Sequence, residues 1–150
     1  MPITYLTLED VVFLHARAVE LSGDGPFAIR ESGILDSVLQ HIQNDDYYPT
    51  VEEKVTHLFH CLACFHCFVN GNKRAALAAS ALFLLNNGYI FRMATFLRAM
   101  ENIVVHVADR RIDKPLLRDI ITAHMCGNED DEDLKLRVLI AISADEINQQ

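Results

Sequence analysis

The stretch that decides the fold is His66-Cys67-Phe68-Val69-Asn70-Gly71-Asn72-Lys73-Arg74, which joins two segments with helical apolar spacing. Its glycine permits a tight turn directly before the second segment, so a helix is expected to begin near Asn72. The first N–H groups of such a helix have no partner inside it, and the positive end of the helix dipole lies there. Lys73 and Arg74 add two full positive charges, and arginine can grip a phosphate with two parallel hydrogen bonds. The stretch therefore predicts an anion-binding site at the start of a helix.

Three further side chains of this stretch extend the prediction from anion binding to chemistry. His66 comes just before the loop, where it can act as a general base. Asn70 offers an oxygen that can face a magnesium ion carried by phosphates, and Asn72 adds an amide donor. Together they indicate phosphoryl or nucleotidyl transfer from a nucleotide. The loop is not a Walker A loop, because the sequence contains no G-x-x-x-x-G-K-(S/T) pattern.

The residues outside this stretch predict a mostly helical chain. Thr7 with Asp10, and Thr50 with Glu53, have the spacing of capping boxes, so helices are expected after Thr7 and after Thr50. The helix that follows the motif is apolar nearly all round and is expected to end at Asn86-Asn87-Gly88, which places it at the centre of the domain. Further helices are expected at about 34–43, 95–107, 114–125 and 134–142, and a short extended segment at 27–30.

Length and composition narrow the class of protein. The chain has 150 residues, of which 51% are hydrophobic, enough for one domain with a full core. The formal net charge is −8, from 13 basic and 21 acidic residues, which disfavours direct nucleic-acid binding because such binding depends on neutralising phosphates. The apolar stretches are shorter than the ~18–20 residues that a membrane span needs, and the opening residues carry no export signal. We therefore expect a cytoplasmic protein with no membrane contact.

The motif, read as H-C-F-V-N-G-N-K-R, resembles the Fic/Doc signature H-x-F-x-(D/E/N)-G-N-x-R, and its lysine is similar to the Doc, or death-on-curing, branch. Three further segments extend the resemblance to about residues 3–125: 29–39, 47–54 and 75–77. The resemblance implies an all-α, mainly helical Fic/Doc fold with a short β-hairpin flap over the site. We accordingly expect a Fic/Doc-like domain at residues 1–126. Residues 127–150, an acidic linker and a C-terminal helix, lie outside the resemblance.

The resemblance also implies a role for each motif residue. His66 falls on the base that activates a target hydroxyl. Gly71 and Asn72 fall on the anion hole, and Arg74 falls on the residue that binds phosphate. Asn70 falls on the position that binds magnesium, but it lacks the carboxylate that is common there and would hold the ion more weakly. This departure leaves a catalytically inactive binding module as an alternative.

Lys73 is the position that distinguishes two chemistries within the resemblance. Doc-like proteins have a lysine here, and they phosphorylate elongation factor Tu and stop translation. Family members with a second glycine at this position transfer AMP. We therefore expect a protein kinase that uses ATP and Mg to phosphorylate a serine or threonine of a translation factor, with AMP transfer as the alternative. Arg30, near the expected flap, is a candidate contact to the nucleotide or the substrate.

The resemblance to Doc also implies a protein partner. Many Fic proteins carry an inhibitory helix of the form (S/T)-x-x-x-E-(G/N), and no serine or threonine of this chain is followed by a glutamate at that spacing. A translation toxin without internal inhibition would harm its host. We therefore expect a separate, Phd-like antitoxin, with a disordered segment that folds into a groove on this protein.

A metal–thiolate site is the remaining alternative. His57, His60, Cys61 and Cys64 fall on one helical face, and Cys61-x2-Cys64-x2-Cys67 has the spacing of an iron–sulfur run. Such a run normally lies in a loop that wraps the cluster, whereas a regular helix turns Cys67 away from Cys61 by about 120°. Free cysteines are also among the most buried residue types, so reduced core thiols are the favoured interpretation.

Overall fold

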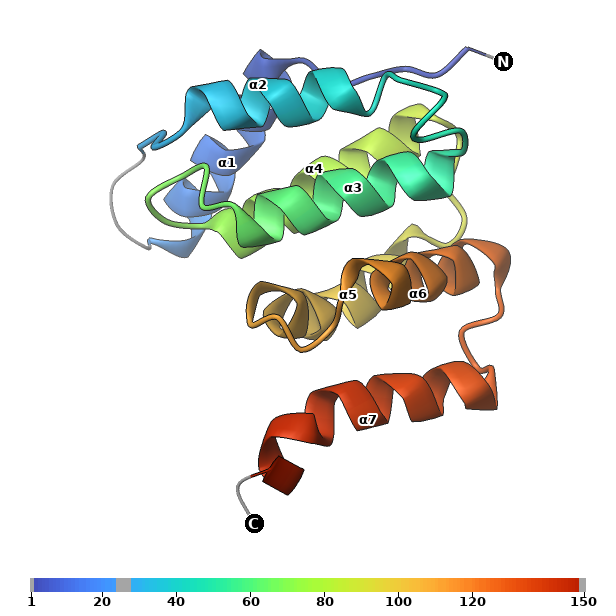
Figure 1. Cartoon of the computed structure of the whole chain (residues 1–150). Helices are drawn as coiled ribbons and strands as arrows, with labels where there is room; N and C mark the ends of the chain where they lie inside the picture. Colours follow the sequence, from blue (N-terminus) through green and yellow to red (C-terminus); the bar gives the residue numbers. More distant parts are fainter. Residues whose placement is uncertain (1, 24–27, 149–150) are drawn as a thin grey trace.

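The computed structural model describes residues 2–23 and 28–148, with side chains as far as residue 144. The helices of the described chain are α1 (Leu8–Ser22), α2 (Ser32–His41), α3 (Val51–Cys64), α4 (Asn72–Asn86), α5 (Met93–Ala108), α6 (Lys114–Cys126) and α7 (Glu132–Asn148). They lie in successive layers, with α1 and α2 on one side, α3 and α4 next, then α5 and α6, and α7 outermost (Figure 1). The predicted all-α fold class is thus confirmed.

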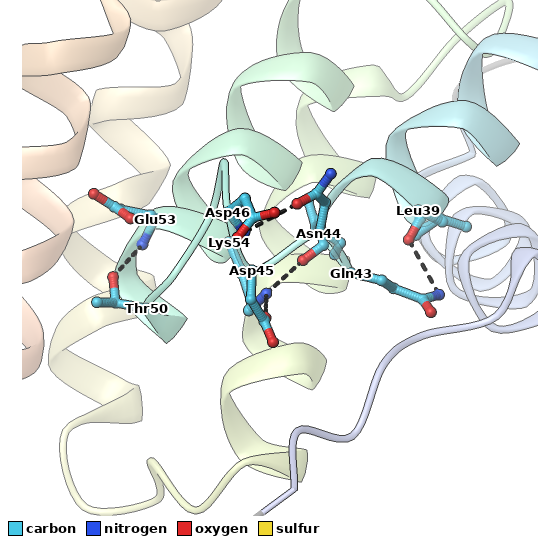
Figure 2. Close-up of polar contacts among 9 residues, drawn as sticks. Leu39, Gln43, Asn44, Asp45, Asp46, Thr50, Glu53 and Lys54 are labelled. Carbon is cyan, nitrogen blue, oxygen red and sulfur yellow. Dashed lines mark hydrogen bonds and ion pairs between the residues drawn. The ribbon is translucent and has the colours of Figure 1, made fainter.

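Short polar contacts fix where the helices begin. Asp10 N–H donates to Thr7 Oγ1 at 3.1 Å and Thr7 N–H donates to the Asp10 carboxylate at 2.9 Å, so the predicted capping box of α1 is confirmed. Glu53 N–H donates to Thr50 Oγ1 at 3.2 Å, which caps α3 as predicted (Figure 2). The return bond expected from the Glu53 carboxylate is not found in the described residues, because that side chain lines a hollow beside α6 instead.

Helices α3 and α4 form the centre of the molecule because both bury a wide surface. In α3, Val55, Leu58, Phe59 and Leu62 are fully buried. Helix α4 buries several alanines, and these small side chains let neighbouring backbones approach closely. Helix α3 packs on α4, α5 and α6, while α4 also packs on α1 (Figure 1). The loop between α3 and α4, which carries the motif, therefore projects from the best-packed part of the molecule.

The expected extended segment is reduced to a single bridge in the residues that the structure describes. Ile29 and Phe68 form an isolated antiparallel bridge, flanked by a bond from Val69 N–H to the Ala28 carbonyl at 3.1 Å. The expected flap hairpin is not found in the described chain, and part of that expectation, Phe27, lies outside it. Residues 28–31 are nevertheless held against the motif by backbone hydrogen bonds.

A buried lysine holds the loop between α2 and α3. Lys54 is 1% exposed, and its ammonium donates to the Ile42 carbonyl at 2.7 Å. It also donates to the Asp45 carboxylate at 2.7 Å (Figure 2). The ammonium also lies 5.4 Å from the centre of the Tyr5 ring, which ties the N-terminal segment to the same loop. Because Asp45 is 78% exposed, this charge pair joins the interior to the surface and leaves only the lysine desolvated.

Replacing Lys54 is expected to lower the free energy of unfolding more than replacing a surface lysine. Lys54→Ala should lower the free energy of unfolding by about 2–3 kcal/mol, because it leaves the Ile42 carbonyl without a donor and removes a buried stem. Urea unfolding followed by circular dichroism measures the change. Lys135, which pairs with Asp130 at 3.3 Å on the surface, is the matched control, and Lys135→Ala should cost less than about 1 kcal/mol. Equal losses for the two variants would contradict this account of Lys54.

Helix α7 packs on the layer of α5 and α6 from outside. It extends beyond the predicted 134–142 at both ends and runs to Asn148. At its start, Glu132 and Asp133 enter the first turn, where the helix dipole favours negative charge. Leu134, Val138 and Ala141 contact the core at helical spacing, and Arg137 pairs with Asp119 of α6 at 2.8 Å. Of the helices described, none is both long enough and apolar enough to cross a membrane.

Candidate functional site

A cavity of about 520 Å³ lies where the α3–α4 loop meets α4 and α5. All of the motif residues predicted for the site line it: His66, Asn70, Gly71, Asn72, Lys73 and Arg74. A further wall comes from one face of α5, whose residues recur at helical spacing: Glu101, Val104, Val105 and Ala108. The cavity therefore combines a polar, cationic wall with a wall that is apolar apart from one carboxylate.

His66 owes its place in the cavity to an unusual backbone conformation. Helix α3 ends at Cys64, and His66 follows with a φ of +51°, which side-chain-bearing residues rarely adopt. This turn reverses the chain, leaves the imidazole exposed and places it on the cavity wall. Left-handed residues other than glycine cluster at functional sites, where surrounding contacts maintain the strained conformation.

Gly71 sets the direction in which α4 leaves the loop. It is the N-cap of α4 with a φ of +75°, and a Cβ at this position would lie 3.1 Å from Val19 Cγ2 and 3.2 Å from His15 Nε2. His15 is fully buried, stacks on Phe68 with ring centres 3.7 Å apart, and approaches the Asn70 carbonyl at 2.5 Å through Nε2. Among the residues that the structure describes, no side chain caps α4, so the N–H groups of its first turn are available to an anion at the cavity.

Asn72 contributes to the site differently from the sequence prediction. Its side-chain oxygen accepts from Phe68 N–H at 3.0 Å, and its side-chain nitrogen donates to the Phe68 carbonyl at 2.9 Å. The amide is thus occupied within the loop, so Asn72 offers the cavity its backbone N–H. Lys73 and Arg74 are exposed on the first turn of α4 and line the cavity as predicted.

Comparison with known proteins agrees with this geometry. The family model described as "Fic/DOC family" matches residues 5–84 of the chain. The chain is also 32% identical over 127 residues to the protein named Toxin Doc of Mycolicibacterium smegmatis (strain ATCC 700084 / mc(2)155), in an alignment that covers 82% of this chain and 92% of that protein. The chain belongs to the Fic/DOC family. The predicted resemblance is thus confirmed, whereas the α5 wall of the cavity lies beyond the residues that the family model matches.

The structure adds to the sequence prediction at Arg30 and at Glu101, while a contact of Arg30 with a ligand stays a prediction. Arg30 was the predicted flap contact, but it is exposed and does not line the cavity, and its N–H donates to the Cys67 carbonyl at 2.8 Å. Glu101 was not predicted, although it lines the cavity. Its spacing from Val104 and Ala108 places the three on one face of α5, but only the packing of α5 on α4 reveals that this face meets the motif.

Three of the four cysteines of this Fic/DOC protein are core thiols, and the fourth, Cys126, is exposed. Cys61, Cys64 and Cys67 are free and buried, and Cys67 lies beyond the end of α3. Burial raises the pKa of all three thiols, that of Cys61 to about 12, whereas metals bind the thiolate. Within the described residues, no group of three or more histidine, cysteine, aspartate or glutamate side chains is placed to hold a metal. The metal–thiolate alternative therefore has no support in the structure.

The close approach at Gly71 predicts opposite effects for two glycine-to-alanine changes. Gly71→Ala should destabilise the protein by about 2–3 kcal/mol, because it adds left-handed strain and pushes a Cβ against Val19 and His15. Gly33 lies inside α2, and no atom lies within 4 Å of its added Cβ, so Gly33→Ala should stabilise by about 0.5–1 kcal/mol. Urea unfolding of both variants tests the pair, and a neutral Gly71→Ala would overturn the packing argument.

Proposed function

We propose that this protein is the toxin of a toxin–antitoxin pair and that it transfers the γ-phosphate of ATP to a hydroxyl of a translation factor. One observation carries the proposal: the imidazole of His66, the uncapped start of α4 and the cations Lys73 and Arg74 line one cavity. The matched relative bears the name Toxin Doc, which supports the same assignment. Elongation factor Tu is the proposed target, on the resemblance to the Doc branch.

The transfer needs a base, a nucleophile and stabilised charge. His66 takes the proton of a target serine or threonine hydroxyl, whose oxygen attacks the γ-phosphorus. The bond from the γ-phosphorus to the bridging oxygen breaks, ADP leaves, and the proton stays on His66. The N–H groups of the first turn of α4, Lys73 and Arg74 stabilise the negative charge on the transferring group.

The side chain at Lys73 favours phosphate transfer over AMP transfer. A glycine would let a diphosphate lie against the backbone, whereas lysine fills that space and adds a charge. The nucleotide is therefore expected to bind in a different position from that in family members with glycine here. The apolar face of α5, formed by Val104, Val105 and Ala108, lines the same cavity and suits the uncharged part of a nucleotide. AMP transfer remains the alternative, because it would use the same base and the same phosphate donors.

The cavity offers few oxygen ligands, and this is enough for magnesium when substrate phosphates and water supply the others. Mg²⁺ prefers oxygen ligands and keeps several waters, and it is usually held by one or two protein groups together with substrate phosphates. Asn70 and Glu101 offer an amide oxygen and a carboxylate on the same cavity. When bound, the ion would neutralise phosphate charge. An inactive binding module is the second alternative, because Asn70 brings no negative charge to the ion.

An antitoxin follows from the proposed toxicity. A chain that arrests translation must be held inactive in its own host, and this sequence has no inhibitory helix of the family pattern. We therefore propose a separate Phd-like antitoxin as the partner. Overexpression of the chain alone should arrest growth, and His66→Ala should remove the arrest. Growth arrest by His66→Ala equal to that of the wild type would contradict an enzymatic toxin.

Label transfer to purified elongation factor Tu tests the chemistry directly. With γ-labelled ATP we expect a labelled target band, and with α-labelled ATP no band. His66→Ala should reduce labelling by about 10²-fold or more, the contribution of a positioned general base. Labelling from the α-position would instead establish AMP transfer and contradict the interpretation of Lys73. Absence of any His66-dependent label would favour the inactive module.

A carboxylate at position 70 is expected to strengthen metal binding. Asn70→Asp should lower the Mg²⁺ concentration needed for half-maximal labelling by several-fold, because a hard cation binds a carboxylate better than an amide. A metal titration of label transfer measures this concentration. Asn86, exposed at the far end of α4, is the matched control, and Asn86→Asp should leave the titration unchanged. An unchanged midpoint for Asn70→Asp would place the ion away from this residue.

A further inference from the structure

A cluster of titratable side chains lies outside the cavity, where the α2–α3 loop, α3 and the first turn of α6 meet. Lys114 Nζ lies 2.7 Å from His57 Nδ1, within hydrogen-bond distance. Tyr48 Oη lies 3.2 Å from the same ring nitrogen, and Cys61 Sγ lies 3.5 Å from His57 Nε2. The Lys114 nitrogen is also 5.2 Å from the centre of the Tyr48 ring. The proposed phosphate transfer uses none of these four side chains.

The surroundings of His57 keep its ring neutral. Burial, followed by the charges of Lys114, His41 and His60, lowers the pKa of His57 to about 4. A neutral ring with its proton on Nε2, toward Cys61, leaves a lone pair on Nδ1 that accepts a hydrogen bond from Lys114. Burial also lowers the pKa of Lys114, against the opposing effect of Cys61. The lysine thus combines eased deprotonation with an adjacent proton acceptor.

A hollow of about 240 Å³ lies beside this cluster. Lys114 lines it together with Tyr48, Glu53, Thr56 and Arg118. The Arg118 guanidinium is half-exposed and lies 3.4 Å from the Asp119 carboxylate, a contact long enough to leave its other N–H groups for a phosphate. The hollow therefore has room for a small phosphorylated compound, with a cation for its phosphate and an amine for its reactive carbon.

Lys114 differs in its surroundings from the other lysines of the chain. Lys54 and Lys135 each pair with an aspartate, and Lys73 lines the cavity formed by the motif and α5. Within the part of the chain that the structure describes, no carboxylate lies at ion-pair distance from Lys114, and Glu53 of the same hollow does not reach it. A carboxylate partner holds an ammonium in its charged form, so Lys114 is freer to lose its proton than either paired lysine.

We propose that Lys114 is a site of acylation by acyl phosphates, with His57 as the proton acceptor. The amine nitrogen attacks the acyl carbon, a C–N bond forms, and the C–O bond to phosphate breaks. Lys114 loses one ammonium proton to solvent before the attack, which frees the nitrogen lone pair. Inorganic phosphate leaves, and the second proton passes from the new amide nitrogen to His57 Nδ1, which releases it to the departing phosphate or to water. The product is a neutral amide that no longer presents an ammonium to His57 or to the Tyr48 ring, so acylation loosens the contact between α6 and α3.

Residue-resolved acylation of the folded, full-length chain tests the proposal. The protein is incubated with acetyl phosphate at neutral pH, and peptide mass spectrometry gives the initial rate of acetylation at each of the four lysines. Lys114 should react roughly tenfold faster than Lys135, below the hundredfold that a well-placed base contributes in an enzyme. In concentrated urea the two rates should become equal. A Lys114 rate no higher than that of Lys135, or a ratio that survives unfolding, would overturn the proposal.

Two histidine variants distinguish proton transfer to His57 from a general effect of the surroundings of Lys114. His57→Gln keeps a hydrogen-bond acceptor but cannot take the proton, so the Lys114 rate should fall to about that of Lys135, which itself should not change. His41, exposed and with its ring centre 6.4 Å from that of His57, is the matched control, and His41→Gln should retain most of the Lys114 rate. Equal rates for the two variants would refute the role of His57. The urea comparison, which needs no variant, decides the proposal if His57→Gln does not fold.

Discussion

The close approach of Gly71 to α1 is the constraint on which the geometry of the site depends. Only a residue without a side chain lets the loop pass against Val19 and His15 in a left-handed conformation. His15 in turn stacks on Phe68 and contacts the Asn70 carbonyl, so α1 supports the loop from the side that faces the core. This support fixes where the backbone turns and hence where the first N–H groups of α4 lie.

The position of His66 follows from contacts on both sides of it. Before it, the end of α3 is joined to the end of α5, because Arg110 donates to the Cys64 carbonyl at 3.4 Å and Cys64 Sγ donates to the Val107 carbonyl at 3.4 Å. After it, Cys67 accepts backbone hydrogen bonds from residues 30 and 31. A left-handed residue can persist between two such anchored points, because relaxation of its φ would break contacts on one side or the other.

Local signals carried most of what the sequence predicted, and long-range packing accounts for the rest. The cap at Thr7 and the turn at Gly71 are decided within a few residues, so spacing alone located the helices and the motif. Glu101 could not be assigned, because its place depends on which face of α5 meets α4. Asn72 was predicted to donate to a ligand, but its side-chain amide bonds to the backbone N–H and C=O of Phe68 instead. The composition of the motif does not reveal this competition.

The motif wall of the cavity is positively charged, whereas the chain as a whole is negatively charged. The two do not cancel, because the net charge acts over a longer distance than the contacts inside the cavity. The net charge of −8 is spread over the surface, where salt screens it within about 8–10 Å. In the proposed phosphate site, Lys73, Arg74 and the start of α4 would act at contact distance from a phosphate, so their charges would outweigh the net charge inside the cavity, while the rest of the surface repels polyanions. A neutral Asn70 shifts this balance further, because it adds no negative charge to the cavity. In the proposed reaction, phosphate is therefore held more by the protein's own donors and less by metal than it would be with an aspartate at this position.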